Sequence, residues 1–333
     1  MNVTMKDVAI KANVSTSTVS RVISGNKKIS DDTRKKVFKV MEELNYHPNV
    51  SARNLARSKT RTLGLVLPGA TKEFLHNPFF IKVIAGISKF AKENDYYIMY
   101  SNTDNEDDEI VTLNHFIRAG VVDGIILTTV RLNDKSIELL RSLDMPYVTI
   151  GRQREYKDSL WVDNDNVNAM YNLVEHLIKK GKKNIAFIGG DIKYNVTNDR
   201  LNGYKKALND NNITFNNDIV EEAEYLEKSG YDAFQRIISK FEVDAVVTTD
   251  DVLAFGVYKV IEERKLSKNI AVAGFNNTPL SEYREPTLTS VDILEEELGY
   301  NAARLLINKL ENGNIETTNY VVNTKLIVRE STL

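Results

Sequence analysis

Apolar residues in the first 46 positions recur at the spacing of three short α-helices. The first helix is expected over residues 5–12, and the second begins after Ser15, whose hydroxyl can accept a free amide of the first turn. A third helix is expected after Ser30, where Asp31 and Asp32 complement the positive end of the helix. The inward-facing positions are Val8, Ala12, Val19, Val22, Ile23, Val37, Val40, Met41 and Leu44. Two helices, a tight turn and a third packing helix predict a helix-turn-helix.

The second predicted helix carries a run of hydroxyl residues, Ser15–Thr18 and Ser20, which are poor helix formers. In a helix-turn-helix the second helix enters the major groove of DNA by its N-terminal end, where short hydrogen-bonding side chains reach base edges and phosphates. The face that remains after the apolar residues turn inward consists of Thr16, Ser17, Ser20 and Arg21. We therefore predict that this face reads DNA; a solvated Ser/Thr-rich helix face is the alternative.

Residues 47–61 predict a short segment that is helical only when it is supported. Pro48 can open a helix, and 49–56 is compatible with about two turns, which is marginal in water without a partner. Leu55 belongs to no apolar stripe, and such a side chain can wedge into a step of the minor groove. The basic residues expected near phosphates are Arg53, Arg57, Lys59 and Arg61. The segment can act as a switch, although a plain basic linker would show the same composition.

From Thr62 onward, short apolar runs alternate with amphipathic helical patterns, which predicts parallel sheets flanked by helices. Helices are expected over residues 78–92, 106–119, 166–180, 200–209 and 252–264. The remaining chain is too long for one such sheet, and its strands divide near residues 161–165. The predicted fold is an all-α helix-turn-helix head followed by an α/β core of two parallel-sheet lobes with a cleft between them.

The charge of the chain is distributed unevenly. The formal net charge is −2, but residues 1–61 contain 13 Lys or Arg against 5 Asp or Glu, a balance of +8, which leaves −10 for residues 62–333. A basic head on an acidic body indicates that the head binds nucleic acid. An incidental basic surface is the alternative.

Composition and motifs argue against several classes of protein. The chain has no cysteine, which excludes disulfides and thiolate catalysis, and no apolar run is long enough for a signal peptide or a membrane span, so we expect a cytoplasmic protein. The four histidines lack the spacing of a helical metal pair, the acidic run 104–109 lacks the glycine of a calcium loop, and no phosphate-cradling motif occurs. We expect no metal, no cofactor and no enzymatic activity.

Candidate ligand-binding residues follow the apolar runs, because ligands of parallel sheets bind at the carboxyl ends of strands. They are Asn77, Phe79, Phe80, Asp163, Arg200, Asp250, Asp251, Asn276 and Asn277. Aromatic rings, a guanidinium, carboxylates and amides together suit a polyhydroxylated ligand. Asp250 and Asp251 could suggest acid–base catalysis, but neighbours at a strand end usually point in different directions, and Asp251 could simply cap a helix beginning at Val252. Trp161 suits packing better than sugar stacking.

These motifs resemble the LacI/GalR family of transcription regulators over nearly the whole chain. The head segment TMKDVAIKANVSTSTVSRVIS and the segment NYHPNVSARNLA carry the resemblance most specifically. The core adds NPFF, WVDND, NDRLNGY, TTDDVLAFG and AGFNNTPLSEYREPTLTSVD. The motifs GFNN, HNPFF and DGIILTTVRLND are most similar to maltose-regulon repressors of Gram-positive bacteria.

The resemblance implies a role for individual residues. The implied DNA-binding set is Thr4, Ser15, Thr16, Ser17, Thr18, Ser20, Arg21, Asn49, Ala52, Arg53 and Leu55, with residues 49–56 folding as a hinge helix on operator DNA and Leu55 inserting at its central step. The implied effector-binding set is Phe79, Phe80, Asp163, Arg200, Asp250 and Asn276, where Arg200 grips the effector and Asn276 replaces the Asp of many members. The core is expected to be periplasmic-binding-protein-like, and the absence of a heptad repeat after KLIVRESTL implies a homodimer.

The leading hypothesis is a dimeric transcriptional repressor that binds near-palindromic operator DNA and is controlled by maltose or a related sugar. The expected domains are a head over 1–46, a hinge over 47–61, an N-terminal lobe over 62–162 with about 291–320, and a C-terminal lobe over 163–290 with about 321–333. A regulator of the catabolite-control type that uses a phosphoprotein co-repressor is the main alternative, and a sugar-binding protein without a regulatory role is another. The sequence leaves the effector, the sign of its effect and the operator sequence open.

Overall fold

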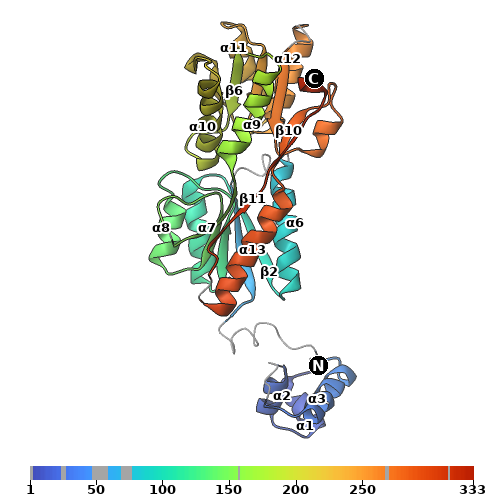
Figure 1. The fold of residues 1–333 in the computed structure, drawn as a ribbon. Helices are drawn as coiled ribbons and strands as arrows, with labels where there is room; N and C mark the ends of the chain where they lie inside the picture. The colour runs from blue at the N-terminus through green and yellow to red at the C-terminus, as the bar shows by residue number, and fades with distance from the viewer. Residues whose placement is uncertain are drawn as a thin grey trace. The chain divides into compact units, whose positions relative to one another are not determined.

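The computed structural model of the chain describes residues 3–23, 28–46, 59–68, 77–156, 158–266, 270–313 and 316–333 (Figure 1). The chain divides into two units, Met1–Arg61 and Thr62–Leu333, and each is described by itself.

The first unit contains the three predicted helices, α1 (Met5–Ala12), α2 (Thr16–Ile23) and α3 (Asp31–Glu43). Their common core consists of Val8, Ala9, Ala12, Val19, Val22, Val37, Val40 and Met41, against which the half-buried Ile23 and Leu44 pack. Side-chain oxygens cap all three helices, because Thr4, Ser15 and Ser30 accept the backbone amides of Asp7, Thr18 and Thr33. The predicted helix-turn-helix is confirmed in these residues.

The second unit begins with a lobe built on a six-stranded parallel sheet. The strands are β1 (Thr62–Pro68), β2 (Tyr97–Thr103), β3 (Gly124–Leu127), β4 (Tyr147–Ile150), β5 (Leu160–Asn164) and β11 (Asn319–Val322), in the order β11-β5-β4-β3-β1-β2. The helices are α6 (Pro78–Glu93), α7 (Glu106–Arg118), α8 (Lys135–Ser142) and α13 (Glu295–Asn312). Helices α6 and α13 pack closely side by side, and α7 packs on α8 (Figure 1).

A second six-stranded sheet forms the other lobe. Its strands are β6 (Ile185–Gly189), β7 (Val220–Glu222), β8 (Ala245–Thr248), β9 (Ala271–Phe275), β10 (Thr289–Asp292) and β12 (Lys325–Ile327), in the order β12-β10-β9-β8-β6-β7. Only the pairing of β12 with β10 is antiparallel among these described strands. Helix α9 (Asn166–Lys179) packs on α10 (Asn195–Asp210), and α11 (Glu227–Ile238) packs on α12 (Asp251–Glu263). The predicted α/β core of two lobes is confirmed.

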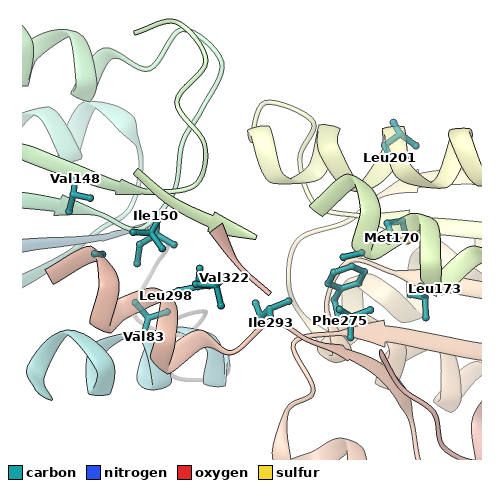
Figure 2. Close-up of a cluster of buried hydrophobic side chains, with 14 of the residues drawn as sticks. Val83, Val148, Ile150, Met170, Leu173, Leu201, Phe275, Ile293, Leu298 and Val322 are labelled. Carbon is teal, nitrogen blue, oxygen red and sulfur yellow. The ribbon is translucent and has the colours of Figure 1, made fainter. Parts of the chain in front are cut away.

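The chain passes between the lobes three times, after β5, β10 and β11. The Asn164 side-chain amide lies at the first crossover and donates to the backbone oxygens of Ile293 and Val322, each at 3.0 Å, at the other two. Ile293 and Val322 are buried in an apolar cluster that continues from one lobe into the other (Figure 2). The three connections are therefore tied together at the base of the cleft. The expected boundaries at 162, 290 and 320 fall inside β5, β10 and β11, so each crossover lies slightly later in the chain.

Helix α10 corrects one expectation. It begins at Asn195, so Arg200 lies inside the helix and does not open it. Tyr194 at the N-cap makes no side-chain capping bond, so the usual signal for a helix start is missing from the sequence.

Candidate functional site

The DNA-reading surface predicted on the head lies on α2. Thr16, Ser17 and Arg21 are exposed, and Ser20 is half-buried. The Ser15 hydroxyl caps the helix and also lies 2.7 Å from the Ser17 hydroxyl and 2.8 Å from the Thr18 hydroxyl. Short polar side chains therefore cover the N-terminal end of a helix that stands next to a tight turn, which is the geometry by which such helices contact bases.

Thr4 also has a structural role, which the spacing of Thr4 and Asp7 could have indicated. Its hydroxyl and the Asp7 carboxylate form a capping box at the start of α1, with the Thr4 amide donating to Asp7 Oδ2 at 2.8 Å. These hydrogen bonds from Thr4 lower the pKa of Asp7. The remaining predicted DNA contacts, Asn49, Ala52, Arg53 and Leu55, lie outside the described residues.

A cavity of about 120 Å³ lies between the two lobes, where the carboxyl ends of the strands meet. All six residues of the implied effector set line it: Phe79, Phe80, Asp163, Arg200, Asp250 and Asn276. We call this cavity the inner pocket. Phe79 and Phe80 come from the first turn of α6, and their rings meet edge to face with centroids 5.1 Å apart. An apolar wall opposite several charged and amide groups is the usual lining of a small-molecule site.

Asp250 is the carboxylate of the inner pocket that accepts a hydrogen bond from the other lobe. Its Oδ2 accepts the side-chain amides of Asn77 at 3.0 Å and Asn276 at 2.9 Å, and its Oδ1 accepts the amide of Val252. Burial raises the pKa of Asp250 to about 7, the neighbouring Asp251 adds to the rise, and the hydrogen bonds oppose it. Asn77 belongs to the first lobe and Asp250 to the second, so this network crosses the pocket.

Arg200 reaches the pocket from α10 as a buried guanidinium. Its Nε donates to the Asn166 side-chain oxygen at 3.0 Å, its Nη1 donates to the Thr249 backbone oxygen, and its guanidinium carbon lies 4.1 Å from the Phe275 ring centroid. Burial lowers the pKa of Arg200. These partners hold the Arg200 side chain in place in the lining of the pocket.

Asp163 supplies a second carboxylate to the pocket. It accepts the backbone amides of Arg152 at 2.9 Å and Asn164 at 2.8 Å, and the side-chain amide of Asn166 at 2.9 Å. Burial raises the pKa of Asp163 to about 6, although these hydrogen bonds oppose the rise. Asp163 and Asp250 thus place carboxylate oxygens in the lining of the pocket from different elements.

Asp251 and Asn277 do not belong to the pocket. Asp251 accepts the Thr278 amide and the hydroxyls of Ser281 and Ser290, each at 2.7 Å, while Asp250 is the residue that caps α12. The alternative interpretation of Asp251 as the cap of this helix is also wrong, because the helix begins one residue earlier, at Asp251 itself. Asn277 donates instead to the Asp292 carboxylate at 3.1 Å.

Several pocket residues were not predicted from the sequence. They include Asn166, Asn195, Tyr225 and Thr249. Asn166 lies two residues after the end of β5 and Thr249 directly follows β8, so the rule for carboxyl ends could have found them. Tyr225 follows β7, a strand of only three residues that leaves no apolar run in the sequence.

A short backbone ladder also joins the lobes beside the inner pocket. The Leu132 amide donates to the Lys193 oxygen at 2.8 Å, and the Asn195 amide donates to the Val130 oxygen at 3.0 Å. These bonds flank an antiparallel bridge between Arg131 and Tyr194, whose ring lies 5.5 Å from the Arg131 guanidinium carbon.

Within the described ranges, no group of three or more acidic or histidine side chains could hold a metal ion. None of the described helices is long and apolar enough to cross a membrane.

Two family models match the chain. The model for bacterial regulatory proteins of the lacI family covers residues 4–49, and the model for a periplasmic-binding-protein-like domain covers residues 174–332. The first match covers the helix-turn-helix. The second covers most of the second lobe together with α13 and β11 of the first lobe.

Curated relatives are similar to this chain in sequence over most or all of its length. The transcriptional regulator MalR of Streptococcus pneumoniae (strain TIGR4) is 42% identical over 83% of this chain and 84% of its own. MalR of Staphylococcus xylosus is 37% identical over 99% of this chain and 98% of its own. Catabolite control protein A of Priestia megaterium is 33% identical, with both chains covered fully.

Solved structures extend the comparison to the fold. The lac repressor dimer bound to operator and the anti-inducer ONPF aligns with a TM-score of 0.85 and 25% identity over the whole of both chains. The complex of the transcriptional regulator CelR with cellobiose aligns with a TM-score of 0.78 and 27% identity, covering 99% of this chain and 100% of the other. With its head, its core and its full-length relatives in agreement, the chain belongs to the lacI family of bacterial regulatory proteins and is a DNA-binding transcriptional regulator.

Proposed function

We propose that the chain represses transcription from a near-palindromic operator and that maltose or a related sugar in the inner pocket controls its affinity for DNA. The observation that carries the proposal is the convergence of two aromatic rings, two carboxylates, a guanidinium and an amide on one cavity between the lobes. Such groups bind vicinal hydroxyls and the apolar faces of sugar rings. The names of the MalR relatives and the CelR complex with cellobiose support a sugar as the ligand.

The head supplies the affinity for DNA in this proposal. Residues 1–61 carry a net charge of +8, and α2 presents exposed hydroxyls. In this proposal, contacts of the basic side chains with phosphates supply most of the affinity, and α2 supplies the discrimination between sequences. A homodimer would present the same surface twice, as the dimeric lac repressor does on its operator. A near-palindromic site is the expected match.

The pocket controls the head by changing how the lobes meet. A hydrogen bond joins Asn77 and Asp250 across the pocket, and sugar hydroxyls would compete for the same carboxylate. A ligand that favours one lobe arrangement shifts the population of that arrangement. A 100-fold change in DNA affinity corresponds to about 2.7 kcal/mol, which lies in the usual range of allosteric coupling. We propose that the sugar is bound and released unchanged, without catalysis.

A regulator of the catabolite-control type is the second candidate. The 33% identity to catabolite control protein A supports it. That reading predicts an operator complex that responds to a phosphoprotein and not to sugar. The relatives with higher identity are both MalR, which favours the sugar.

A gel shift on the DNA upstream of the protein's own coding sequence, with and without maltose, tests the proposal. We expect retardation at about 50 mM salt, weakening steeply as salt rises, and a change in the bound fraction when maltose is added. Absence of retardation at low salt rejects the repressor. Retardation that ignores maltose and other neutral sugars, but responds to a phosphoprotein, supports the second candidate.

A further inference from the structure

Asn276 enters the inner pocket on an unusual turn of the backbone. Its amide pairs with the Val291 oxygen of β10 at 2.8 Å, and its side chain lines the pocket and donates to Asp250 Oδ2 at 2.9 Å. The φ angles of Asn276 and Asn277 are 93° and 46°, so two successive residues other than glycine have positive φ. Such residues are uncommon and persist where the surrounding structure holds them. Contacts outside the turn must therefore maintain it.

The contacts that hold this turn converge on Asn277. Its backbone amide donates to the Ser290 hydroxyl at 3.0 Å, and its side-chain amide donates to the Asp292 carboxylate at 3.1 Å. Its side-chain oxygen accepts from Arg329 Nη2 at 2.8 Å. Ser290 and Asp292 belong to β10, and Arg329 follows β12, which runs beside β10 (Figure 1). Residues from β10 and from the end of the chain thus meet at the residue next to Asn276.

Arg329 holds more than one part of the chain at once. Its side chain is only 12% exposed, and its Nη1 donates to the Leu288 backbone oxygen at 2.8 Å. Its Nη2 donates to the Glu282 carboxylate at 2.9 Å as well as to Asn277. A planar guanidinium carries several donors in fixed directions, so it can keep several acceptors in place. Arg329 therefore ties Asn277 and Leu288, at the two ends of the connection from β9 to β10, to one side chain.

Arg329 does not line the inner pocket. It can reach the pocket only through Asn277 and the turn that carries Asn276. A second anchor, Asp251, accepts the amide of Thr278 at 2.7 Å and holds the next residue of the same connection. Because Asp251 remains, loss of the Arg329 guanidinium is expected to shift the turn without unfolding the connection.

We propose that Arg329 is a positioning residue for the ligand: it holds Asn277 in its left-handed conformation and thereby keeps the Asn276 amide in place in the inner pocket. This inference rests on the proposed function. A small-molecule site depends on a few precisely placed polar groups, and a displacement of about 1 Å is enough to loosen such a site. The C-terminal segment thus contributes to the affinity for a ligand that it does not contact.

A double-mutant cycle, measured by calorimetry on the full-length protein, tests the inference. Glucose, maltose and cellobiose are the probes, and the cycle uses the sugar that binds most tightly. We expect Arg329→Gln to weaken its binding about 10-fold in the wild-type chain but less than about twofold in a chain that carries Asn276→Ala, because the amide that Arg329 positions is then absent. A role in stability alone would give equal factors in both chains.

Ser331→Ala is the matched control, because it loosens the same segment without touching Asn277. The Ser331 hydroxyl accepts the Thr289 amide at 2.8 Å and donates to the Val272 oxygen at 2.7 Å. We expect this substitution to lower the Tm and to leave sugar binding within about twofold of the wild type. A loss of affinity as large as that of Arg329→Gln would contradict the positioning role.

The outcomes separate the positioning role from the proposed function. If Arg329→Gln leaves the affinity unchanged, or weakens it equally with and without Asn276→Ala, the positioning role fails and the sugar regulator stands. If none of the three sugars binds, the proposed sugar control fails, and a crystal structure of Arg329→Gln decides: an Asn276 amide displaced from Asp250 supports the inference, and an unchanged turn overturns it. Should Arg329→Gln not fold, Asn277→Gly replaces it in both experiments with the same expectations, because glycine accepts positive φ but lacks the side chain that Arg329 holds.

Discussion

Asn77 and Asp250 are the N-cap residues of α6 and α12, and a hydrogen bond of 3.0 Å between their side chains joins the two lobes. Asn77 Oδ1 accepts the amide of Phe79 at 3.0 Å, and Asp250 Oδ1 accepts the amide of Val252 at 2.8 Å. Each side chain therefore caps its own helix with one atom and meets the other lobe with the second. Two positive helix ends share one buried carboxylate across the inner pocket.

Replacing Asn77 with Ser should separate the capping role from the link between lobes. Serine retains a capping oxygen, but it has no amide with which to reach Asp250. Loss of a hydrogen bond to a buried carboxylate is expected to lower the free energy of unfolding by about 1–3 kcal/mol, measured by urea denaturation. Asn105→Ser, at the exposed N-cap of α7, is the matched control and should cost less than about 0.5 kcal/mol. Equal effects of the two substitutions would show that only capping matters.

The buried carboxyls predict an unusual pH dependence of stability. Burial raises the pKa of Asp250 and Glu295 to about 7, and of Asp163 and Asp251 to about 6, from ordinary values of 3.8 for Asp and 4.5 for Glu. Between the unfolded and folded pKa values the folded chain binds more protons, so the free energy of unfolding falls as pH rises through about 4 to 7. We expect a lower Tm at pH 8 than at pH 5.5.

Asp250→Asn removes one titrating group and should flatten this dependence by on the order of 2 kcal/mol across the window. Asparagine keeps the capping oxygen, so the start of α12 is preserved. Asp107→Asn, an exposed position on α7, is the control and should leave the slope unchanged. The explanation fails if the Tm rises steadily between pH 5.5 and pH 8, or if Asp250→Asn leaves the slope as steep as in the wild type.

Helix starts show where prediction from sequence succeeded and where it could not. Helices α6, α7, α9 and α12 begin at Asn or Asp caps, and the expected ranges met them within a residue. Helices α10, α11 and α13 follow Tyr194, Leu226 and Leu294, none of which makes a side-chain capping bond. Helix α10 was expected five residues late, and the other two were not anticipated. These helices are held by packing within their lobes, α10 on α9, α11 on α12 and α13 on α6, and no local sequence pattern records such packing. Helix α8 was not predicted either: Asp134 caps it, but the helix is only 8 residues long and gives a short apolar pattern.

The pocket residues also divide into those that a local sequence pattern marks and those that it does not. Asp163, Asp250 and Asn276 lie within a buried strand or no more than two residues after one, so an apolar run followed by polar residues marks them in the sequence. Asn195 is the first residue of α10, whose start has no capping side chain, and Tyr225 follows β7, whose three residues form no apolar run. The link from Asn77 to Asp250 spans 173 positions in the chain, and only tertiary structure reveals it.

Close packing between α6 and α13 depends on two glycines. A Cβ on Gly86 would lie 1.9 Å from the backbone oxygen of Glu296, and a Cβ on Gly299 would lie 2.0 Å from that of Val83. Gly86→Ala should therefore lower the free energy of unfolding by about 2–3 kcal/mol even though alanine favours helices. It should also weaken sugar binding, because Leu298 of α13 lines the inner pocket.

The exposed Ala85 offers a control in the same helix. Ala85→Gly weakens α6 by about 1 kcal/mol through helix propensity alone and should leave sugar binding unchanged. Urea denaturation and calorimetry measure the two effects. A stability increase for Gly86→Ala would mean that the helices separate without cost, contrary to the packing seen here.

Substitutions on α2 test whether the hydroxyl face reads bases. Thr16→Ala removes an exposed side chain near the start of the helix and should weaken operator binding by about 1–3 kcal/mol while leaving non-specific binding and the salt dependence nearly unchanged. Lys39→Ala, on the exposed face of α3, is the control and should affect operator and non-specific DNA alike, if at all. Fluorescence anisotropy with operator and scrambled duplexes, at several salt concentrations, measures both quantities. Equal weakening of both duplexes by Thr16→Ala would assign this hydroxyl to the phosphate backbone, and no weakening would remove it from the interface.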